Sequence, residues 1–245
     1  MNKISIDKLS LWNILKEIEF DDLSHPICKG LCKYLDIESN FPEGWIFTIE
    51  SNNAFPHADF YNYNETYNKT ESIGIFLGLS SFIIEHYRDS IIYNEIIATL
   101  NKYISLMYDD NLGDMGPTGY ITLVNTMKKV NLQGYDYEKL ENRLKELVNR
   151  SIQRNPHQWL NYGYRPSDYI KSQNSMFYFD NKDIVDVELD FLIDTLPEND
   201  VWPISWSWFG NNKLYPKEST ISENWCKANK AIDRSLFLKN FDRLL

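Results

Sequence analysis

The sequence predicts an all-α protein in which antiparallel helix pairs form an α/α toroid, either complete or partial. Roughly nine stretches space their apolar residues as amphipathic helices do, and at most one short stretch, residues 45–49, has a strand pattern. Long irregular segments rich in aromatic residues separate some of these helices. Consecutive antiparallel helix pairs are typical of α/α solenoids and toroids. Because no Gly- or Ser-rich linker interrupts the chain, we expect residues 1–245 to form a single α/α-toroid-like domain.

The positions of the expected helices follow from apolar periodicity and from capping residues. Ser24, with Pro26 in the following turn, is a favourable N-cap, and Thr70 has the same role before a strongly apolar run. We expect helices over residues 6–19, from Ser24 to about residue 35, from Thr70 to about residue 87, over 90–108, 118–130, 137–152 and 183–196, and a last pair that begins at Ser219 or Thr220.

Two glycines lie inside the helix expected after Thr70. Gly74 and Gly78 are four residues apart, and an interior glycine costs a helix about 1 kcal/mol relative to alanine. The close approach of a neighbouring backbone would account for both of them.

Composition excludes several classes of partner. The net charge is −10, and no run of Lys and Arg is present to neutralise nucleic-acid phosphates or anionic lipids. The longest apolar run, residues 73–84, is far shorter than the ~20 residues of a membrane span. The amino terminus lacks a signal-peptide core, and three cysteines are too few for a secreted disulfide scaffold. We therefore expect a cytoplasmic protein with reduced thiols, no nucleic-acid partner and no membrane span.

Two irregular segments contain the candidate site residues. Residues 194–230 hold four of the seven tryptophans, of which Trp202, Trp206 and Trp208 form a cluster too rich in Pro and Trp for a helix. They either line an apolar cavity or fill the core, since buried tryptophan is usually packing. In residues 38–68, His57 and Asp59 are candidates for a general acid/base and its orienting carboxylate, with Tyr61 beside them. The alternative is that His57 only holds this loop together.

These two segments also carry a resemblance to a known group. The stretch DVWPISWSWFGN, residues 200–211, precedes a helix that contains ENWCKAN, and PHADFY, residues 56–61, precedes NKTE and a Gly-containing helix. The chain is similar to uncharacterised bacterial proteins related to the squalene-cyclase and protein-prenyltransferase α/α-toroid superfamily, which carry GGWPISW and PHAPWW in such places. Residues 59–61 and 200–201 depart from that pattern. The resemblance spans about half of the chain and implies the toroid more than any chemistry.

Motifs for particular reactions are missing from the sequence. The Asp-x-Asp-Asp motif of the related terpene cyclases is not found, nor are P-loop, Rossmann, G-x-S-x-G or H-E-x-x-H patterns. Cys28 and Cys32 are one helical turn apart but have no second pair of ligands, so a zinc site is disfavoured. The acidic cluster of Asp109, Asp110 and Asp114 would suit Mg²⁺ and a diphosphate, although a solvated turn selects the same residues. We assign no cofactor.

The predicted fold and the aromatic segments lead to two functional hypotheses. In the first, the toroid binds an apolar small molecule, with isoprenoids among the candidates, and transforms it as a cyclase-like or prenyltransferase-like enzyme. His57 and Asp59 would be the catalytic groups, while Tyr61, Trp202, Trp206 and Trp208 would bind the substrate. In the second, a non-catalytic module of the same fold recognises a peptide, lipid or sugar through its aromatic loops. Titratable groups that converge around a closed cavity would favour the enzyme hypothesis. An open aromatic groove would favour the binding module.

Overall fold

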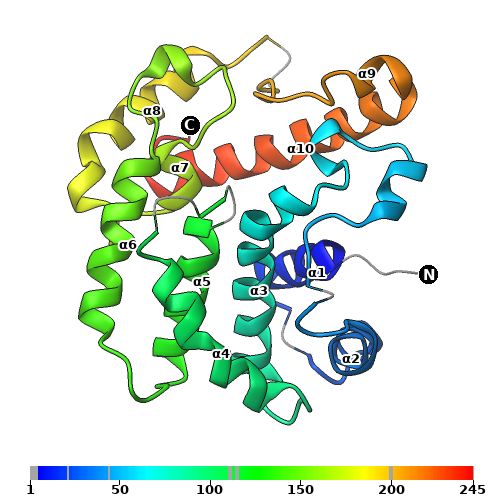
Figure 1. Cartoon of the computed structure of the whole chain (residues 1–245). Helices are drawn as coiled ribbons and strands as arrows, with labels where there is room; N and C mark the ends of the chain where they lie inside the picture. The colour runs from blue at the N-terminus through cyan, green and yellow to red at the C-terminus, as the bar shows by residue number, and fades with distance from the viewer. Residues whose placement is uncertain are drawn as a thin grey trace. The chain divides into compact units, whose positions relative to one another are not determined.

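The computed structural model describes residues 5–20, 22–43, 45–109, 112–113, 116–198 and 201–244. Over these residues the chain forms ten α-helices and no strand, which confirms the all-α fold class (Figure 1). The contacts divide the chain into two compact units, which we call unit 1 (Met1–Asn52 and Tyr63–Leu144) and unit 2 (Asn53–Asn62 and Lys145–Leu245). The expectation of a single domain stays a prediction. None of the helices in the described part of the chain has both the length and the apolar character of a membrane span.

Unit 1 contains five complete α-helices and the start of a sixth. These are α1 (Ser5–Glu17), α2 (Pro26–Lys33), α3 (Glu65–His86), α4 (Tyr93–Leu106), α5 (Gly116–Lys129) and α6 (Tyr137–Ser151), the last of which ends in unit 2. A π-helical turn, η1 (Tyr34–Glu38), continues α2, and the 3-10 turn η2 (Glu50–Ala54) follows.

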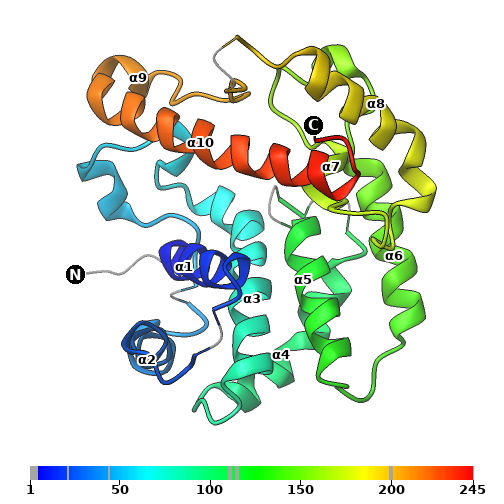
Figure 2. The same cartoon turned by 180° about the vertical axis from the view of Figure 1, so that it is seen from behind.

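Helix α3 is the centre of unit 1. Every described residue from Ile73 to Ile84 is buried, so the helix is covered on all sides rather than along one stripe. In both views α3 lies between α1 and α5, and α4 packs against it as well (Figures 1 and 2). The apolar run at residues 73–84 is therefore the core of unit 1.

Glycine permits the closest helix contact in this core. A Cβ atom on Gly119 of α5 would lie 3.4 Å from the Cα of Gly74 in α3 and 3.0 Å from a Leu77 side-chain atom. The predicted backbone approach at Gly74 is thereby confirmed. At Gly78 the neighbour is a side chain instead, because a Cβ there would lie 2.3 Å from the Leu9 side chain of α1.

The segment before α3 differs from expectation. Helix α3 begins at Glu65, where the Asn64 side chain accepts a hydrogen bond from the Tyr67 amide at 2.9 Å, so the prediction of Thr70 as N-cap is wrong. Thr70 lies inside the helix, and its hydroxyl donates to the Tyr67 carbonyl. Residues 45–49 form no strand, because their polar backbone is bound by side chains of α3 rather than by a second strand. The Asn68 Oδ1 accepts from the Thr48 amide and its Nδ2 donates to the Thr48 carbonyl, each at 2.8 Å.

Unit 2 is built from α7 (Pro166–Tyr169), α8 (Lys182–Asp194), α9 (Asn211–Leu214), α10 (Pro216–Asn240) and the end of α6. The short turns are η3 (Asp59–Tyr61), η4 (Pro156–Gln158) and η5 (Phe179–Asn181). Helix α10 passes α9 at its amino end and α7 near its carboxyl end (Figures 1 and 2).

Helix α10 is one helix of 25 residues, so the predicted final pair is wrong. It begins at Pro216, a residue suited to the first helical position, because its missing N–H is not needed there. The Ser219 and Thr220 hydroxyls donate to the Pro216 carbonyl inside the first turn, so neither residue is the cap. No glycine and no further proline interrupt the chain up to Asn240, and one helix results.

Replacement of Asn68 should destabilise unit 1. In N68A the buried amide and carbonyl of Thr48 lose their partners, and each unsatisfied group costs about 1–3 kcal/mol. We expect urea denaturation to show a free energy of unfolding lower by roughly 2–4 kcal/mol. N94A, at an exposed position of α4, is the control and should change stability little. Equal stability of the two variants would show that these hydrogen bonds contribute nothing.

Candidate functional site

The two aromatic segments singled out in the sequence meet in unit 2, where Asp59 joins them. Its Oδ2 accepts a hydrogen bond from the Gly210 amide at 3.0 Å, and its Oδ1 accepts from the Asn211 amide at 3.1 Å. The Asn211 side chain in turn donates to the His57 carbonyl at 2.8 Å. The carboxylate thus satisfies free N–H groups at the start of α9, which is a capping role.

His57 uses both ring nitrogens within its own segment. Its Nδ1 lies 2.5 Å from the Phe55 carbonyl and its Nε2 2.8 Å from the Asn62 Oδ1. Within the described part of the chain, His57 and Asp59 therefore hydrogen-bond to other groups and not to each other. The geometry matches the alternative in which His57 holds the loop together, and the catalytic role of the two residues stays a prediction.

The three tryptophans of the cluster point to three different places. Trp202 is buried and its indole N–H donates to the Leu192 carbonyl of α8 at 3.0 Å. Trp208 donates to the Ser222 hydroxyl of α10 at 3.3 Å. Trp206 is half-buried, and its ring centroid lies 6.0 Å from that of Phe60, whose ring also packs on Tyr61. The buried Trp202 matches the alternative of core packing, and the assignment of the three tryptophans to substrate binding stays a prediction.

Trp206 lines a polar cleft of about 170 Å³, which we call the arginine cleft. One wall comes from the segment that enters α7, and the other from α10. Its principal lining residues are Tyr164, Arg165, Asp168, Trp206, Lys230 and Arg234. All of them belong to unit 2. A smaller cavity of about 50 Å³ adjoins it, walled by Trp159, Phe191 and Trp202, and Arg165 and Arg234 line both spaces.

Arg234 is only 9% exposed although it carries a charge. One of its guanidinium nitrogens donates to the Pro203 carbonyl at 3.2 Å, and the group lies 5.8 Å from the centre of the Trp202 ring. Burial and, to a smaller extent, the neighbouring positive charge of Arg165 together lower the pKa of Arg234 to about 10. A pKa of about 10 still leaves the side chain protonated at neutral pH.

Arg165 has a matching environment. Its guanidinium donates to the Trp159 carbonyl and lies 5.5 Å from the centre of the Phe191 ring. Burial lowers the pKa of Arg165, while the negative charges of Glu188 and Asp168 oppose that change. The two arginines are therefore a pair of like charges that are both partly removed from water.

Glu188 supplies negative charge behind the cleft. This carboxylate of α8 is fully buried and accepts two hydrogen bonds from Ser167, from the amide and from the hydroxyl, each at 2.7 Å. Burial raises the pKa of Glu188 from 4.5 to about 7, although the Ser167 hydrogen bonds and Arg165 act in the opposite direction. The carboxylate also fixes the start of α7, and with it the position of the adjacent Arg165.

Arg165, Arg234 and Glu188 were not among the residues predicted from the sequence. One signal for Glu188 was present: it follows Val185 by three residues and precedes Leu192 by four, so it lies on the apolar face of α8. The aspartates of the same helix, Asp183 and Asp190, are exposed. The two arginines lie far apart in the chain, and no local pattern connects them.

The described residues show no metal site. Within them, no three His, Cys, Asp or Glu side chains gather as metal ligands would. Cys28 and Cys32 are free thiols in unit 1, and burial raises the pKa of Cys32 to about 11, which keeps it protonated. Asp109 is exposed, whereas Asp110 and Asp114 lie outside the described residues. The acidic cluster as a magnesium site therefore stays a prediction.

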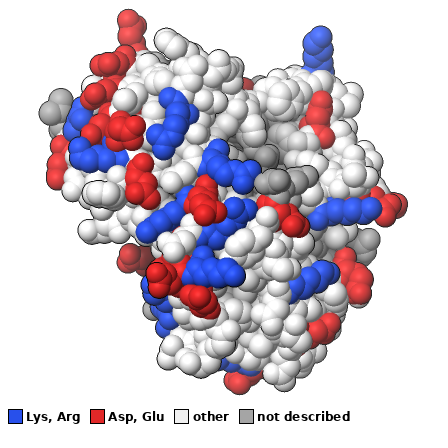
Figure 3. Space-filling model, turned by 60° about the vertical axis from the view of Figure 1, so that its left-hand side comes forward, with Lys and Arg blue, Asp and Glu red and all other residues white. Residues whose placement is uncertain are grey.

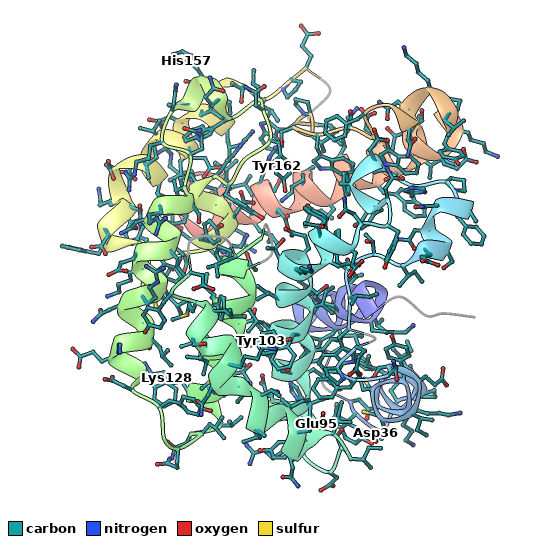
Figure 4. All side chains as sticks on the ribbon, viewed as in Figure 1. Asp36, Glu95, Tyr103, Lys128, His157 and Tyr162 are labelled. Atoms are coloured by element: carbon teal, nitrogen blue, oxygen red, sulfur yellow. The ribbon has the colours of Figure 1, made fainter. Side chains whose placement is uncertain are left out.

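Unit 1 has a groove of about 680 Å³ beside α2, lined by Leu23, Ile37 and Ile91 among others. Asp36, labelled in Figure 4, is its acidic group. This carboxylate accepts hydrogen bonds from the Tyr87 and Ser90 hydroxyls, and so it is already satisfied. The exposed surface of the groove is mainly apolar despite Lys29, Lys33 and His86 in its lining, whereas the arginine cleft has a more polar lining that includes the buried Arg234. We therefore take the arginine cleft as the candidate functional site.

Comparisons with known proteins find no match to this chain among family models, curated proteins or solved structures.

Removal of the Glu188 charge should change how stability depends on pH. Because the folded pKa is about 7 and the ordinary value is 4.5, the folded state holds a proton that the unfolded state has lost between these values. The free energy of unfolding therefore falls as the pH rises through this window and levels off above it. E188Q should lose this component, which is on the order of 3 kcal/mol because one pKa unit corresponds to about 1.4 kcal/mol. Urea denaturation between pH 5 and 8 measures it, with E218Q on the exposed face of α10 as control. A stability difference between E188Q and wild type that is constant over this range would contradict the assignment.

Loss of the Asp59 carboxylate should loosen the junction of the two aromatic segments. In D59A the Gly210 and Asn211 amides lose their acceptors, and removal of a capping side chain costs about 1 kcal/mol. Hydrogen exchange read by NMR should be faster at these two amides, with α3 unchanged. D59N, which keeps one oxygen acceptor, should have an intermediate effect. Unchanged protection at Gly210 and Asn211 in D59A would show that other contacts hold the junction.

Proposed function

We propose that this protein binds a small molecule in the arginine cleft. The observation that carries the proposal is the convergence of polar groups from α7 and α10 on one concave space beside an indole ring. Binding sites for small molecules are concave and combine aromatic walls with a few converging polar groups. Elsewhere, basic and acidic side chains lie next to one another across much of the face shown in Figure 3, as on an ordinary solvated surface.

Aromatic side chains give the cleft its ligand-stacking surface. Trp206 is held on its outer side by Phe60, and the Tyr164 ring packs on that of Tyr169 at 5.4 Å. Tyr162, labelled in Figure 4, is exposed at the rim. A planar or partly apolar ligand body against Trp206 fits these walls.

The size and polarity of the cleft favour a small polar ligand, or one with a polar end, over the wholly apolar ligand expected from the sequence. A volume of about 170 Å³ is below the roughly 300–1,000 Å³ of sites for drug-sized molecules. A small polar molecule, or the polar end of a longer one such as an isoprenoid, suits it better than a folded hydrocarbon chain. The toroidal arrangement and the relationship to squalene cyclases and prenyltransferases remain part of the proposal. Their support is the two resembling sequence blocks, of which residues 56–61 and 206–211 contact each other in unit 2.

Catalysis is the second candidate function, and one observation favours it. The Ser167 hydroxyl lines the cleft and donates to Glu188, whose pKa lies near neutrality. A hydroxyl bound to a carboxylate that titrates near pH 7 is an arrangement suited to general-base activation of a nucleophile. Turnover that S167A abolishes without loss of ligand binding would favour this function over binding alone. The free thiols of the three cysteines agree with the cytoplasmic location that we also propose.

Native mass spectrometry of protein purified from its own host tests the binding function. We expect a bound small molecule on the wild-type chain, and W206A should lose it because the ligand loses its stacking partner. W225A is the matched control, since Trp225 lies on α10 with 75% of its surface exposed, and it should keep the ligand. Retention by W206A would remove the cleft from the proposal. A stoichiometric protein partner in place of a ligand would favour a protein-binding module.

A further inference from the structure

We propose that the ligand of the arginine cleft carries a carboxylate or phosphate group, which binds between the guanidinium groups of Arg165 and Arg234. This inference rests on the proposed binding function and names the chemical class of the ligand.

The first argument is the cost of placing the two arginines together. Arg234 is 9% exposed, and the charge of Arg165 is close enough to act on it. Removal of two like charges from water is unfavourable unless negative charge and hydrogen bonds compensate for it. A pair of partly buried guanidinium groups that both face one cavity is therefore an arrangement that an anion would stabilise.

The second argument is the position of the carboxylates nearby. Among the described residues, no carboxylate oxygen lies within the 4.0 Å of an ion pair from either guanidinium. Asp168 and Asp233 each lie 3.6 Å from Lys230 instead, and Glu188 is bound to Ser167. Within the described residues, carboxylates thus compensate the arginines only at longer range, which leaves the short-range position for a ligand anion.

The third argument is the supply of hydrogen-bond donors. A guanidinium group has five N–H donors in a planar fork that matches carboxylate and phosphate oxygens. In the part of the chain that the structure describes, Arg165 donates to the Trp159 carbonyl and Arg234 to the Pro203 carbonyl. Each group therefore keeps donors for a ligand.

The charge of the cleft supports an anion of small size. Arg165, Lys171, Lys230 and Arg234 line it, against Asp168 and Asp233, in a chain whose net charge is −10. A long polyanion would be repelled by the acidic remainder of the surface. A molecule with one anionic group and a small planar body fits both the cleft of about 170 Å³ and the indole of Trp206.

Isothermal titration calorimetry with three probes tests this inference. Phenyl phosphate and benzoate carry the two anionic groups on an aromatic ring, and benzyl alcohol carries a neutral one. We expect at least one of the anions to bind, more weakly as the salt concentration rises, and benzyl alcohol to bind at least tenfold more weakly. The stronger of the two anions then identifies phosphate or carboxylate as the group recognised.

Two substitutions locate the anion. R234Q should weaken binding of the preferred anion at least tenfold, because it removes a charge that is largely shielded from water. R243Q is the matched control in unit 2, since Arg243 pairs with Asp190 outside the cleft, and it should bind like the wild type. If R234Q proves unfolded by circular dichroism, R234K keeps the charge without the planar fork and should still reduce the affinity.

Each negative result would overturn a different part of the proposal. Benzyl alcohol binding that W206A abolishes, without binding of either anion, would overturn the anionic class and leave the proposed binding function standing. Equal anion binding by R234Q and the wild type, or by R234K where it is the variant used, would overturn the assignment to the arginines. No binding of either anion to the folded wild-type protein up to millimolar concentration would also overturn the inference. An apo mass in native mass spectrometry would remove the binding function as well.

Discussion

The buried carboxylate of Glu188 is the constraint on which the arrangement of unit 2 depends. It lies on the inner face of α8 and receives both hydrogen bonds from Ser167, which sets the start of α7. Arg165 directly precedes α7, and so its side chain lines the same cleft as that of Arg234 on α10. A fully buried carboxylate is unfavourable without such hydrogen bonds and positive charge nearby. Ser167 and Arg165, which stabilise this carboxylate, also line the cleft, so the packing of unit 2 and the lining of the cleft depend on the same groups.

The structure of unit 1 depends on the burial of an apolar helix rather than on a buried charge. Helix α3 is buried on every side from Ile73 to Ile84, so its neighbours must cover it completely. Gly74 and Gly119 let α5 approach closely, and the Leu9 side chain of α1 occupies the space that a side chain at Gly78 would need. Asn68 extends this packing to an irregular segment, because it satisfies the backbone of Thr48 where no strand is present to do so. Unit 1 therefore has the features of a scaffold, and the convergent charges lie in unit 2.

The aromatic segments show how one sequence feature can have several structural roles. Asp59 holds residues 53–62 against the start of α9, and Phe60 supports Trp206 at the edge of the cleft. Trp202 instead fills the interior beside α8, and Trp208 binds α10. A tryptophan cluster in a sequence thus indicates a structured segment, but the Trp202 and Trp208 indoles donate to different acceptors, and of the three only Trp206 lines the cleft.

The sequence by itself determined the all-α class and the approximate position of most helices, because the apolar period is a local property of the chain. The caps differed from the prediction, and His25 rather than Ser24 is the N-cap of α2. The composition of residues 38–68 and of the tryptophan cluster also predicted irregular, structured segments, since it is incompatible with regular helices. Local signals were insufficient where tertiary contacts compete with them. Asn64 replaced Thr70 as a cap, and side chains of α3 replaced a strand partner for residues 45–49. Only the tertiary structure decided the composition of the cleft, because Arg165, Glu188 and Arg234 come from three separate helical elements. Their charges affect one another only after folding has brought them together and removed water from between them.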